Sequence, residues 1–533
     1  MIVLGRDQTT NQPVTLSQEA RSRGLYVIGS TGTGKTTLLQ SIAYQDMKAG
    51  HGVCVIDPHG DMIDWIIAHI PQERVPDVIL FDPSDHTYPI GLNPLDCDRN
   101  DQVQVRFVVS TILTTLQRLF WYSWGPRLEH VLHHTLRTTL KIKNSSLVEL
   151  LLLLTSETYR GEKIGKERRK IKGSNNKEIF NPKYGARGYT GILDYDNDRL
   201  LINFWYDWFL RMPNRTEVVS STVNKLSPFL LDPMMRNIIG QSENKLKLPN
   251  IIKNKKILLV NLSKGQLGEN NSALLGTVLI NLILIAALQR GEVSFKARAE
   301  NPFHLIVDEY QNFASESFSL LQSEARKYGI DVVVAHQFRD QLSREVKGAA
   351  LNVGNFVSFR TTGVDGQEMA MQFDNTPPDP EKMYVPNVMD VEHPQYPSAV
   401  RPDQFGFMRP MPQRMYSDVM MQTANELSNL PPFVARMRLI GRNSETGKPE
   451  LQQFQAENID PRSEEDGGVS DPLRTTAYGN INNVNMAHVR LQSRAIATHY
   501  KLVEDEIMRR TNHEIRPEFS YPPLYGFVKT NDE

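Results

Sequence analysis

The stretch that decides the fold is GSTGTGKT, residues 29–36, which matches the phosphate-binding pattern G-x-x-x-x-G-K-[ST] at every required position. An apolar run at residues 25–28 precedes it, and a helical pattern follows from residue 35 to about residue 48. This strand–loop–helix order lets glycine N–H groups turn toward phosphate oxygens, where the helix N-terminus adds a favourable dipole. The sequence therefore predicts a nucleotide-binding site.

Each residue type in this loop has an expected task. We expect Lys35 to contact the β- and γ-phosphates and the Thr36 hydroxyl to ligate Mg²⁺, so the predicted cofactors are ATP and Mg²⁺. The residues expected to bind the nucleotide are Gly29, Ser30, Thr31, Gly32, Thr33, Gly34, Lys35, Thr36 and Thr37.

A second apolar run, HLIVDE at residues 304–309, ends in two acids. A buried strand with this ending is typical of the other half of such a site. Asp308 would hold Mg²⁺ through water, and Glu309 would polarise an attacking water. A kinase or a GTP switch would not need the adjacent glutamate, so the pair favours an ATPase; a surface strand ending in two acids is the alternative.

A third apolar run, residues 331–335, is followed by His336 and Gln337. Gln337 would sense the γ-phosphate or align the water, unless it is an ordinary loop residue. Three arginines come after it, and ring ATPases commonly use an arginine from a neighbouring subunit to stabilise the transferring phosphate. For any one of the three, a surface role is favoured over this one. They are Arg339, Arg344 and Arg360.

The spacing between the motifs predicts the domain organisation. Lys35 and Asp308 lie 273 residues apart, too far for one sheet with short connections, and the sequence between them is largely helical in pattern. We expect an α/β P-loop core with a mostly parallel sheet, interrupted by an all-α inserted domain. The predicted parts are residues 1–100 and 251–442 for the core, with a proline-rich loop at 374–415, residues 101–250 for the insert, and residues 443–533 for a tail with a terminal helix.

Charge and composition limit how the chain could contact DNA. Its 533 residues include 60 basic and 61 acidic side chains, a net charge of −1, which excludes a globally basic nucleic-acid binder. Any contact must come from a local patch. Residues 160–187 hold ten basic and three acidic side chains, a balance of +7, and would either bind phosphates or form a solvated loop.

The apolar runs and the cysteines indicate the cellular compartment that we expect for the chain. The longest apolar run, residues 274–288, is interrupted by Thr277 and Asn281 and is shorter than the roughly 20 residues of a membrane span, so we expect a buried core helix. Residues 1–7 lack the pattern of a signal peptide, and the two cysteines, Cys54 and Cys97, suit a reducing cytosol.

Two histidine-containing groups invite a metal interpretation. Asp57, His59 and Asp61 follow the strand at residues 52–57, but the proline and glycine between them favour a turn. The other group has the i, i+3, i+4 spacing of one helix face and lacks an acidic or cysteine partner, so packing or surface roles are favoured. It consists of His130, His133 and His134.

Taken in order, the motifs resemble those of the HerA/FtsK superfamily of DNA-pumping ATPases, and within it the type IV secretion coupling proteins. The resemblance implies a RecA-like motor that works as a hexameric ring, passes DNA through its pore and carries an all-α insert. It also implies a glutamine sensor at Gln337, an acidic site residue at Asp57, and a trans-acting arginine at Arg339 or Arg360. The matching segments are residues 29–37, 56–61, 91–95, 259–265, 305–311, 323–329 and 335–337.

The function expected from this resemblance is an ATP-hydrolysing DNA translocase that couples a conjugative DNA substrate to a secretion channel. Its expected partners are DNA, further copies of the chain, the relaxosome and channel proteins. Coupling proteins usually begin with membrane-spanning helices, whereas here the motor begins near Met1. We therefore expect a cytoplasmic protein, either free or docked at the inner face of the membrane through partners.

Three alternatives stay open. One is a cytosolic HerA-like helicase that acts with a nuclease. Another is a docking protein whose ATP site only controls assembly, and a third is a secretion ATPase that handles protein and no DNA.

Overall fold

The computed structural model describes residues 1–164, 198–342, 344–373, 416–442, 449–458 and 478–511, together with four short strand segments: β6 (Ile171–Lys172), β7 (Glu178–Ile179), β12 (Tyr384–Pro386) and β13 (Met408–Pro410). Most of the basic stretch at 160–187, most of the proline-rich loop at 374–415 and much of the predicted tail lie outside the described residues.

An 11-stranded sheet forms the core, in the order β2-β1-β15-β14-β11-β3-β10-β9-β4-β8-β5. The strands from β11 to β5 are parallel to one another, and the remaining pairs are antiparallel. This mostly parallel α/β sheet is the arrangement predicted from the sequence. The bounds are β1 (Ile2–Asp7), β2 (Pro13–Leu16), β3 (Leu25–Ile28), β4 (Gly52–Asp57), β5 (Val78–Phe81), β8 (Ile257–Asn261), β9 (Phe303–Val307), β10 (Ile330–His336), β11 (Asn355–Ser358), β14 (Val434–Arg442) and β15 (Pro449–Asn458).

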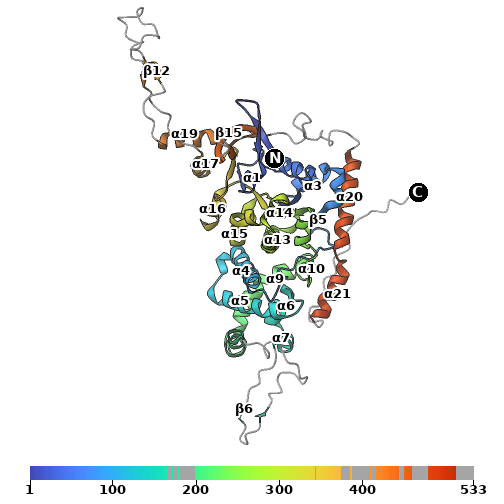
Figure 1. Cartoon of the computed structure of the whole chain (residues 1–533). Helices are drawn as coiled ribbons and strands as arrows, with labels where there is room; N and C mark the ends of the chain where they lie inside the picture. Colours follow the sequence, from blue (N-terminus) through green and yellow to red (C-terminus); the bar gives the residue numbers. More distant parts are fainter. Residues whose placement is uncertain are drawn as a thin grey trace, which may run out of the picture.

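Helices cover both faces of the sheet, and the alternation of side chains along each strand explains why (Figure 1). In β4, Val53 and Val55 belong to the core cluster that contains α2 (Lys35–Lys48) and α3 (Asp61–His69). Cys54 and Ile56 belong to the other cluster, with α13 (Glu269–Gln289). Because successive side chains of a strand point to opposite faces, a continuous apolar run supplies both layers.

The predicted core helix is α13. The stretch Glu269–Glu292 is long and apolar enough to cross a membrane by composition, but 89% of its most apolar window is buried inside the protein. It packs against α4 (Gln102–Leu119) and α15 (Glu316–Glu324). The prediction of a buried core helix is therefore confirmed.

Between β5 and β8 the described chain is almost entirely helical, as the pattern of residues 101–250 predicts. These helices lie together at one end of the molecule, below the sheet in Figure 1. Local signals start several of them: Asp101 caps α4, and Ser146 with Glu149 forms a capping box on α6. Besides α4 they are α5 (Pro126–Lys141), α6 (Leu147–Thr155), α7 (Glu157–Ile164), α8 (Arg199–Asn203), α9 (Arg215–Leu230), α10 (Pro233–Ile239) and α11 (Leu248–Lys253).

The C-terminal part differs from the sequence-based expectation in two ways. Residues 449–458, which the boundary at 442 assigned to the tail, form β15 and pair with β14 and β1 inside the core sheet. The single terminal helix is in fact two, α20 (Tyr478–Ile496) and α21 (Tyr500–Arg510), because His499 caps a new helix. β15 has a polar sequence because most of its side chains are exposed or half-buried, so no apolar run revealed it.

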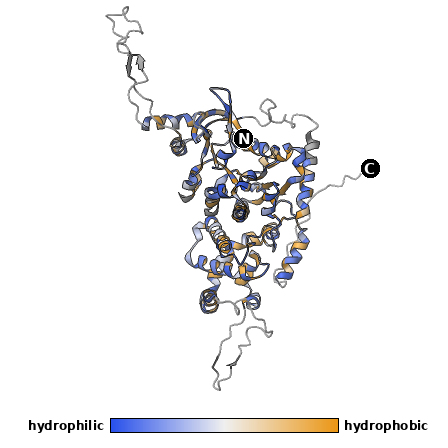
Figure 2. Ribbon diagram, viewed as in Figure 1, coloured by the Kyte–Doolittle hydropathy of each residue, from blue (hydrophilic) through white to orange (hydrophobic). Residues whose placement is uncertain are grey.

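The two C-terminal helices run along the edge of the molecule, where α20 contacts the core sheet and α21 contacts the helical region. Ser493 of α20 accepts a hydrogen bond from the backbone N–H of Leu80 in the edge strand β5 (2.8 Å). Arg510 of α21 donates to the buried Glu149 carboxylate (2.5 Å) and to the Gly240 carbonyl (2.6 Å). Figure 2 shows hydrophilic and hydrophobic segments alternating along both helices, as expected for helices with one packed face.

Candidate nucleotide-binding site

The phosphate-binding loop lies between β3 and α2, at the carboxyl edge of the parallel strands. Two of its glycines have left-handed backbones, Gly32 with φ 74° and Gly34 with φ 110°, a region that other residues rarely adopt. Gly34 is also the N-cap of α2, so the first N–H groups of that 14-residue helix face the loop. This is the geometry that accommodates a phosphate chain.

Lys35 is buried within this loop. Its ammonium donates to the carbonyl oxygens of Gly29 (2.7 Å) and Ser30 (3.1 Å). Burial lowers its pKa, while the nearby carboxylates of Glu309 and Asp308 oppose that shift. The lysine is therefore held where phosphate oxygens can replace the two carbonyls.

The register of the sheet brings the acidic pair to the same edge. Val307 pairs with Val334 of β10 and Ile56 of β4, so Asp308 lies just beyond the strand, between two neighbours. The Thr36 hydroxyl approaches its carboxylate at 3.4 Å. A hydroxyl beside a carboxylate is the hard oxygen donor set that Mg²⁺ prefers, so the two residues fit the predicted metal role.

Burial shapes the electrostatics of Asp308. Desolvation and the carboxylates of Glu309 and Asp57 raise its pKa to about 6. The backbone N–H of Glu309, which donates to Asp308 at 2.8 Å, opposes that rise. A divalent cation bound to Asp308 would stabilise its ionised form and so lower the pKa again.

Glu309 adopts a left-handed backbone, with φ 47° and ψ 50°, and is 6% exposed. Its carboxylate accepts hydrogen bonds from the amides of Gln337 (2.7 Å) and Gln311. The Gln337 carbonyl oxygen in turn accepts from the Thr31 hydroxyl at 3.0 Å. The predicted sensor therefore links the loop directly to the predicted catalytic base, and such a backbone outlier is common at functional sites.

These positions agree with the comparison of the chain with known families. Residues 2–191 match the family model described as the central domain of the helicase HerA. The likeness to that family thus extends over the first part of the chain only. No curated protein sequence matches it.

Solved structures of low sequence identity share the fold of this chain. The unbound bacterial conjugative coupling protein TrwBdeltaN70 is 15% identical, with a TM-score of 0.53 over 85% of this chain and 90% of that chain. TrwB with ADP and Mg²⁺ is 15% identical, with a TM-score of 0.51 over 85% of this chain and 90% of that chain. TrwB with an ATP analogue is 15% identical, with a TM-score of 0.51 over 83% and 87%. The chain thus has the RecA-like P-loop NTPase fold.

Asp57, which the resemblance implies to be an acidic site residue, is the last residue of β4. Its carboxylate is fully buried and accepts backbone hydrogen bonds from His59 (2.8 Å), Gly60 (2.9 Å) and Met62 (3.0 Å). It thus shapes the turn that begins α3, which agrees with the turn interpretation of this segment. Burial raises its pKa, and its charge reaches the nucleotide site through Asp308.

Arg339 does not fit a role in a neighbouring subunit. It is 3% exposed, and its guanidinium donates to Glu368 (2.7 Å), the Tyr26 hydroxyl (3.1 Å) and the Lys347 carbonyl (3.2 Å). These contacts hold the Arg339 side chain inside its own chain. Arg339 follows β10 and Gln337 closely in the sequence, so the same contacts fix the backbone near Gln337.

Arg360 remains compatible with a role across an interface. Its carbonyl accepts from the backbone N–H of Ser30 at 2.8 Å, so it lies beside the phosphate loop. Its side chain is half-buried, and among the described residues its guanidinium has no ion-pair or hydrogen-bond partner. The side chain of Arg344 lies outside the described residues.

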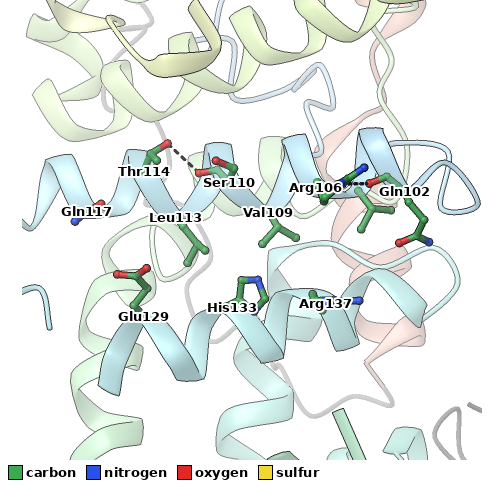
Figure 3. Close-up of a pocket in the computed structure, with 11 residues that line it drawn as sticks. Gln102, Arg106, Val109, Ser110, Leu113, Thr114, Gln117, Glu129, His133 and Arg137 are labelled. Atoms are coloured by element: carbon green, nitrogen blue, oxygen red, sulfur yellow. Dashed lines mark hydrogen bonds between the residues drawn. The ribbon is translucent and has the colours of Figure 1, made fainter. Parts of the chain in front are cut away.

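The helical region contains the histidines that the sequence singled out. His134 stacks on Phe204 with ring centroids 4.6 Å apart, and His130 meets Trp208 edge-on at 4.7 Å. These contacts agree with packing roles. His133 instead faces a cavity of about 680 Å³ between α4 and α5, with Val109 and Leu113 opposite it (Figure 3).

Two residues beside the phosphate loop were not found from the sequence. The backbone N–H of Phe433 donates to the Thr33 carbonyl, and the Asn458 side chain donates to the Gly34 carbonyl, both at 2.8 Å. Phe433 directly precedes β14, and Asn458 is the last residue of β15, so both lie about 400 residues further along the chain than the loop. No local pattern marks such residues, because their role depends on which strands become neighbours.

Proposed function

We propose that this chain is an ATP-hydrolysing DNA translocase of a conjugation or type IV secretion system, which couples a DNA substrate to the transfer channel. The observation that carries the proposal is the meeting of Lys35, Thr36, Asp308, Glu309 and Gln337 at one edge of the sheet. Because these groups can bind phosphates, a metal ion and an attacking water together, they support hydrolysis rather than nucleotide binding alone.

In the proposed reaction, ATP binds with its phosphates against the N–H groups of the loop. Lys35 exchanges the Gly29 and Ser30 carbonyls for β- and γ-phosphate oxygens. Thr36 and Asp308 would hold Mg²⁺, which when bound would neutralise charge at the phosphates. Glu309 then accepts a proton from the attacking water.

Gln337 gives this cycle a way to sense the γ-phosphate. In the described state its amide group bonds both Thr31 and Glu309, so the base is restrained. A γ-phosphate beside Thr31 offers the Gln337 N–H₂ group a second anionic acceptor, which competes with the Glu309 carboxylate. We propose that this exchange frees the Glu309 carboxylate for the water.

DNA handling and ring assembly belong to the same proposal. The fold is that of a protein described as a conjugative coupling protein, over 85% of this chain. We propose a hexameric ring, with residues 101–250 as an inserted domain on one face and Arg360 acting across the interface. The site of action is the cytoplasm or the inner face of the membrane, reached through relaxosome and channel partners.

The family model favours a second candidate. Residues 2–191 match the central domain described for the helicase HerA. The second candidate is therefore a cytosolic HerA-like helicase that works with a nuclease and uses the same ATP chemistry. Co-purification with a nuclease would favour that candidate, and co-purification with a relaxase or a channel protein would favour the coupling function.

The decisive experiment measures ATP hydrolysis without DNA, with single-stranded DNA and with duplex DNA. We expect DNA to stimulate the wild-type rate, whereas Lys35→Ala and Glu309→Gln abolish turnover. A slow rate that no nucleic acid changes would overturn the motor proposal and leave an ATP-gated docking protein.

A further inference from the structure

Phe433 is an exposed aromatic residue in a conformation that aromatic residues avoid. Its φ is 65°, in the left-handed region, where a bulky side chain is a genuine outlier. The side chain is 45% exposed, so burial of the ring does not account for the strain. Strained residues that persist in a fold cluster at ligand clamps and active sites.

The surroundings of Phe433 fix it against the phosphate loop. Its N–H donates to the Thr33 carbonyl, and its carbonyl accepts from the N–H of Asn458, both at 2.8 Å. The Asn458 side chain reaches the Gly34 carbonyl at the same distance. Hydrogen bonds therefore join the antiparallel pair β14–β15 to the phosphate loop, with Phe433 between them.

The ring lies directly beside Gly34. A Cβ atom placed on Gly34 would come within 2.9 Å of the Phe433 Cδ1 atom. Glycine at this position therefore allows the close approach of the ring, and it also tolerates the positive φ. Gly34 precedes Lys35, and the helix that starts there carries the N–H groups that face the phosphates. An apolar surface is thus held next to the phosphate site with part of its area open to solvent.

We infer that Phe433 is the platform on which the base of the bound nucleoside triphosphate stacks, and that Asn458 positions this platform. The inference rests on the proposed ATP function and deepens it by assigning the base subsite. A planar base has a polarisable face that stacks on an aromatic ring regardless of base identity. Phe433 should therefore strengthen nucleotide binding without selecting adenine over guanine by hydrogen bonds.

The test compares ligands that share the phosphates and differ in the base. Binding of ATP, GTP and inorganic tripolyphosphate, each with Mg²⁺, is measured by calorimetry on the full chain and on Phe433→Gly. Glycine accepts the left-handed backbone and keeps the N–H bond to Thr33, so the loop should stay in place. Phe433→Trp serves as the conservative variant, and Phe295→Ala removes a 63% exposed phenylalanine elsewhere as a control.

We expect Phe433→Gly to weaken ATP and GTP binding by about fivefold to a hundredfold, while tripolyphosphate binding changes less than about twofold. Phe433→Trp and Phe295→Ala should bind ATP as the wild type does. Equal losses for ATP and tripolyphosphate would overturn the inference, because the hairpin would then only position the loop. Unchanged ATP binding would overturn it as well.

Lys35→Ala separates this inference from the proposed function. It should abolish binding of all three ligands, since it removes the cation that faces the phosphates. If Lys35→Ala binds the ligands normally, the proposed ATP site is wrong. If it fails to bind while Phe433→Gly binds ATP normally, the ATP site stands and the base platform is wrong.

Discussion

Arg118 of α4 connects the helical region to the loop that follows Asp308 and Glu309, the proposed metal ligand and catalytic base. Its guanidinium donates to the carbonyls of Asn312 and Ala314, both at 2.7 Å. Asn312 in turn donates through its N–H and its side-chain amide to the Glu309 carbonyl, each at 2.9 Å. We predict that Arg118→Met loosens this loop and lowers the rate of hydrolysis.

The magnitude follows from the two carbonyls that lose their donor. A hydrogen bond from a charged group contributes about 1.5–3 kcal/mol, and we take the lower figure because Arg118 is only partly buried, which gives about 3 kcal/mol for the pair. At about 1.4 kcal/mol for each factor of ten, local opening of residues 310–314 should become roughly 100-fold more frequent. The Glu309 backbone would lose its support in the same step.

Hydrogen exchange of residues 310–314 measures this opening, and steady-state hydrolysis measures its effect on catalysis. We expect kcat to fall while KM for ATP changes little, because the phosphate loop itself is untouched. Arg106→Met is the matched control, since this exposed arginine of the same helix donates, among the described residues, a hydrogen bond only to the Gln102 carbonyl of its own helix (Figure 3). Exchange and kcat like those of the control would refute the reasoning.

Three further predictions concern other parts of the molecule. Asp308→Asn should stabilise the metal-free protein at pH 7 by up to about 3 kcal/mol and abolish hydrolysis, because a pKa of about 6 makes ionised Asp308 costly. Between about pH 4 and pH 6 the folded wild type keeps a proton on Asp308 that the unfolded chain loses, so the wild type loses stability as pH rises. The stability gain of Asp308→Asn should therefore grow over this range in thermal melts with EDTA. A gain that is equal at every pH would contradict the prediction. Arg510→Met should leave the buried Glu149 charge unpaired, cost about 3–5 kcal/mol and expose α21 to limited proteolysis; protection like that of the wild type would count against this. Gln337→Ala should retain ATP binding but lower kcat, since the γ-phosphate loses the Gln337 N–H₂ donor proposed to sense it; a change in Kd alone would rule out the sensor role.

The nucleotide site was largely predictable because it is made of short strands that each end in a functional group. The residues after β3, β9 and β10 were recognised from apolar runs ended by Gly29, Asp308 and Gln337. Parallel strands place their carboxyl ends at one edge, so residues far apart in sequence were expected to meet there. The long interval between Lys35 and Asp308 likewise indicated the helices that the structure describes between β5 and β8.

The surroundings of the site could not be predicted in the same way. Arg339 was a candidate for a neighbouring subunit, but the hydrogen bonds of its buried side chain to Glu368 and Tyr26 keep it within its own chain. β15 carried no apolar signal, because its exposed position in the sheet allows polar side chains. Both outcomes depend on which elements become neighbours, and local sequence does not specify that.

By itself, the amino-acid sequence determined the phosphate loop, the acid pair, the glutamine and the order of strands and helices. Those features are local, since they follow from backbone freedom at glycine, the alternation of side chains and the chemistry of a residue at a strand end. Only the tertiary structure decided that Phe433 and Asn458 clamp the loop. Their hydrogen bonds join segments about 400 residues apart, and their geometry exists only once the antiparallel hairpin has completed the sheet beside β11.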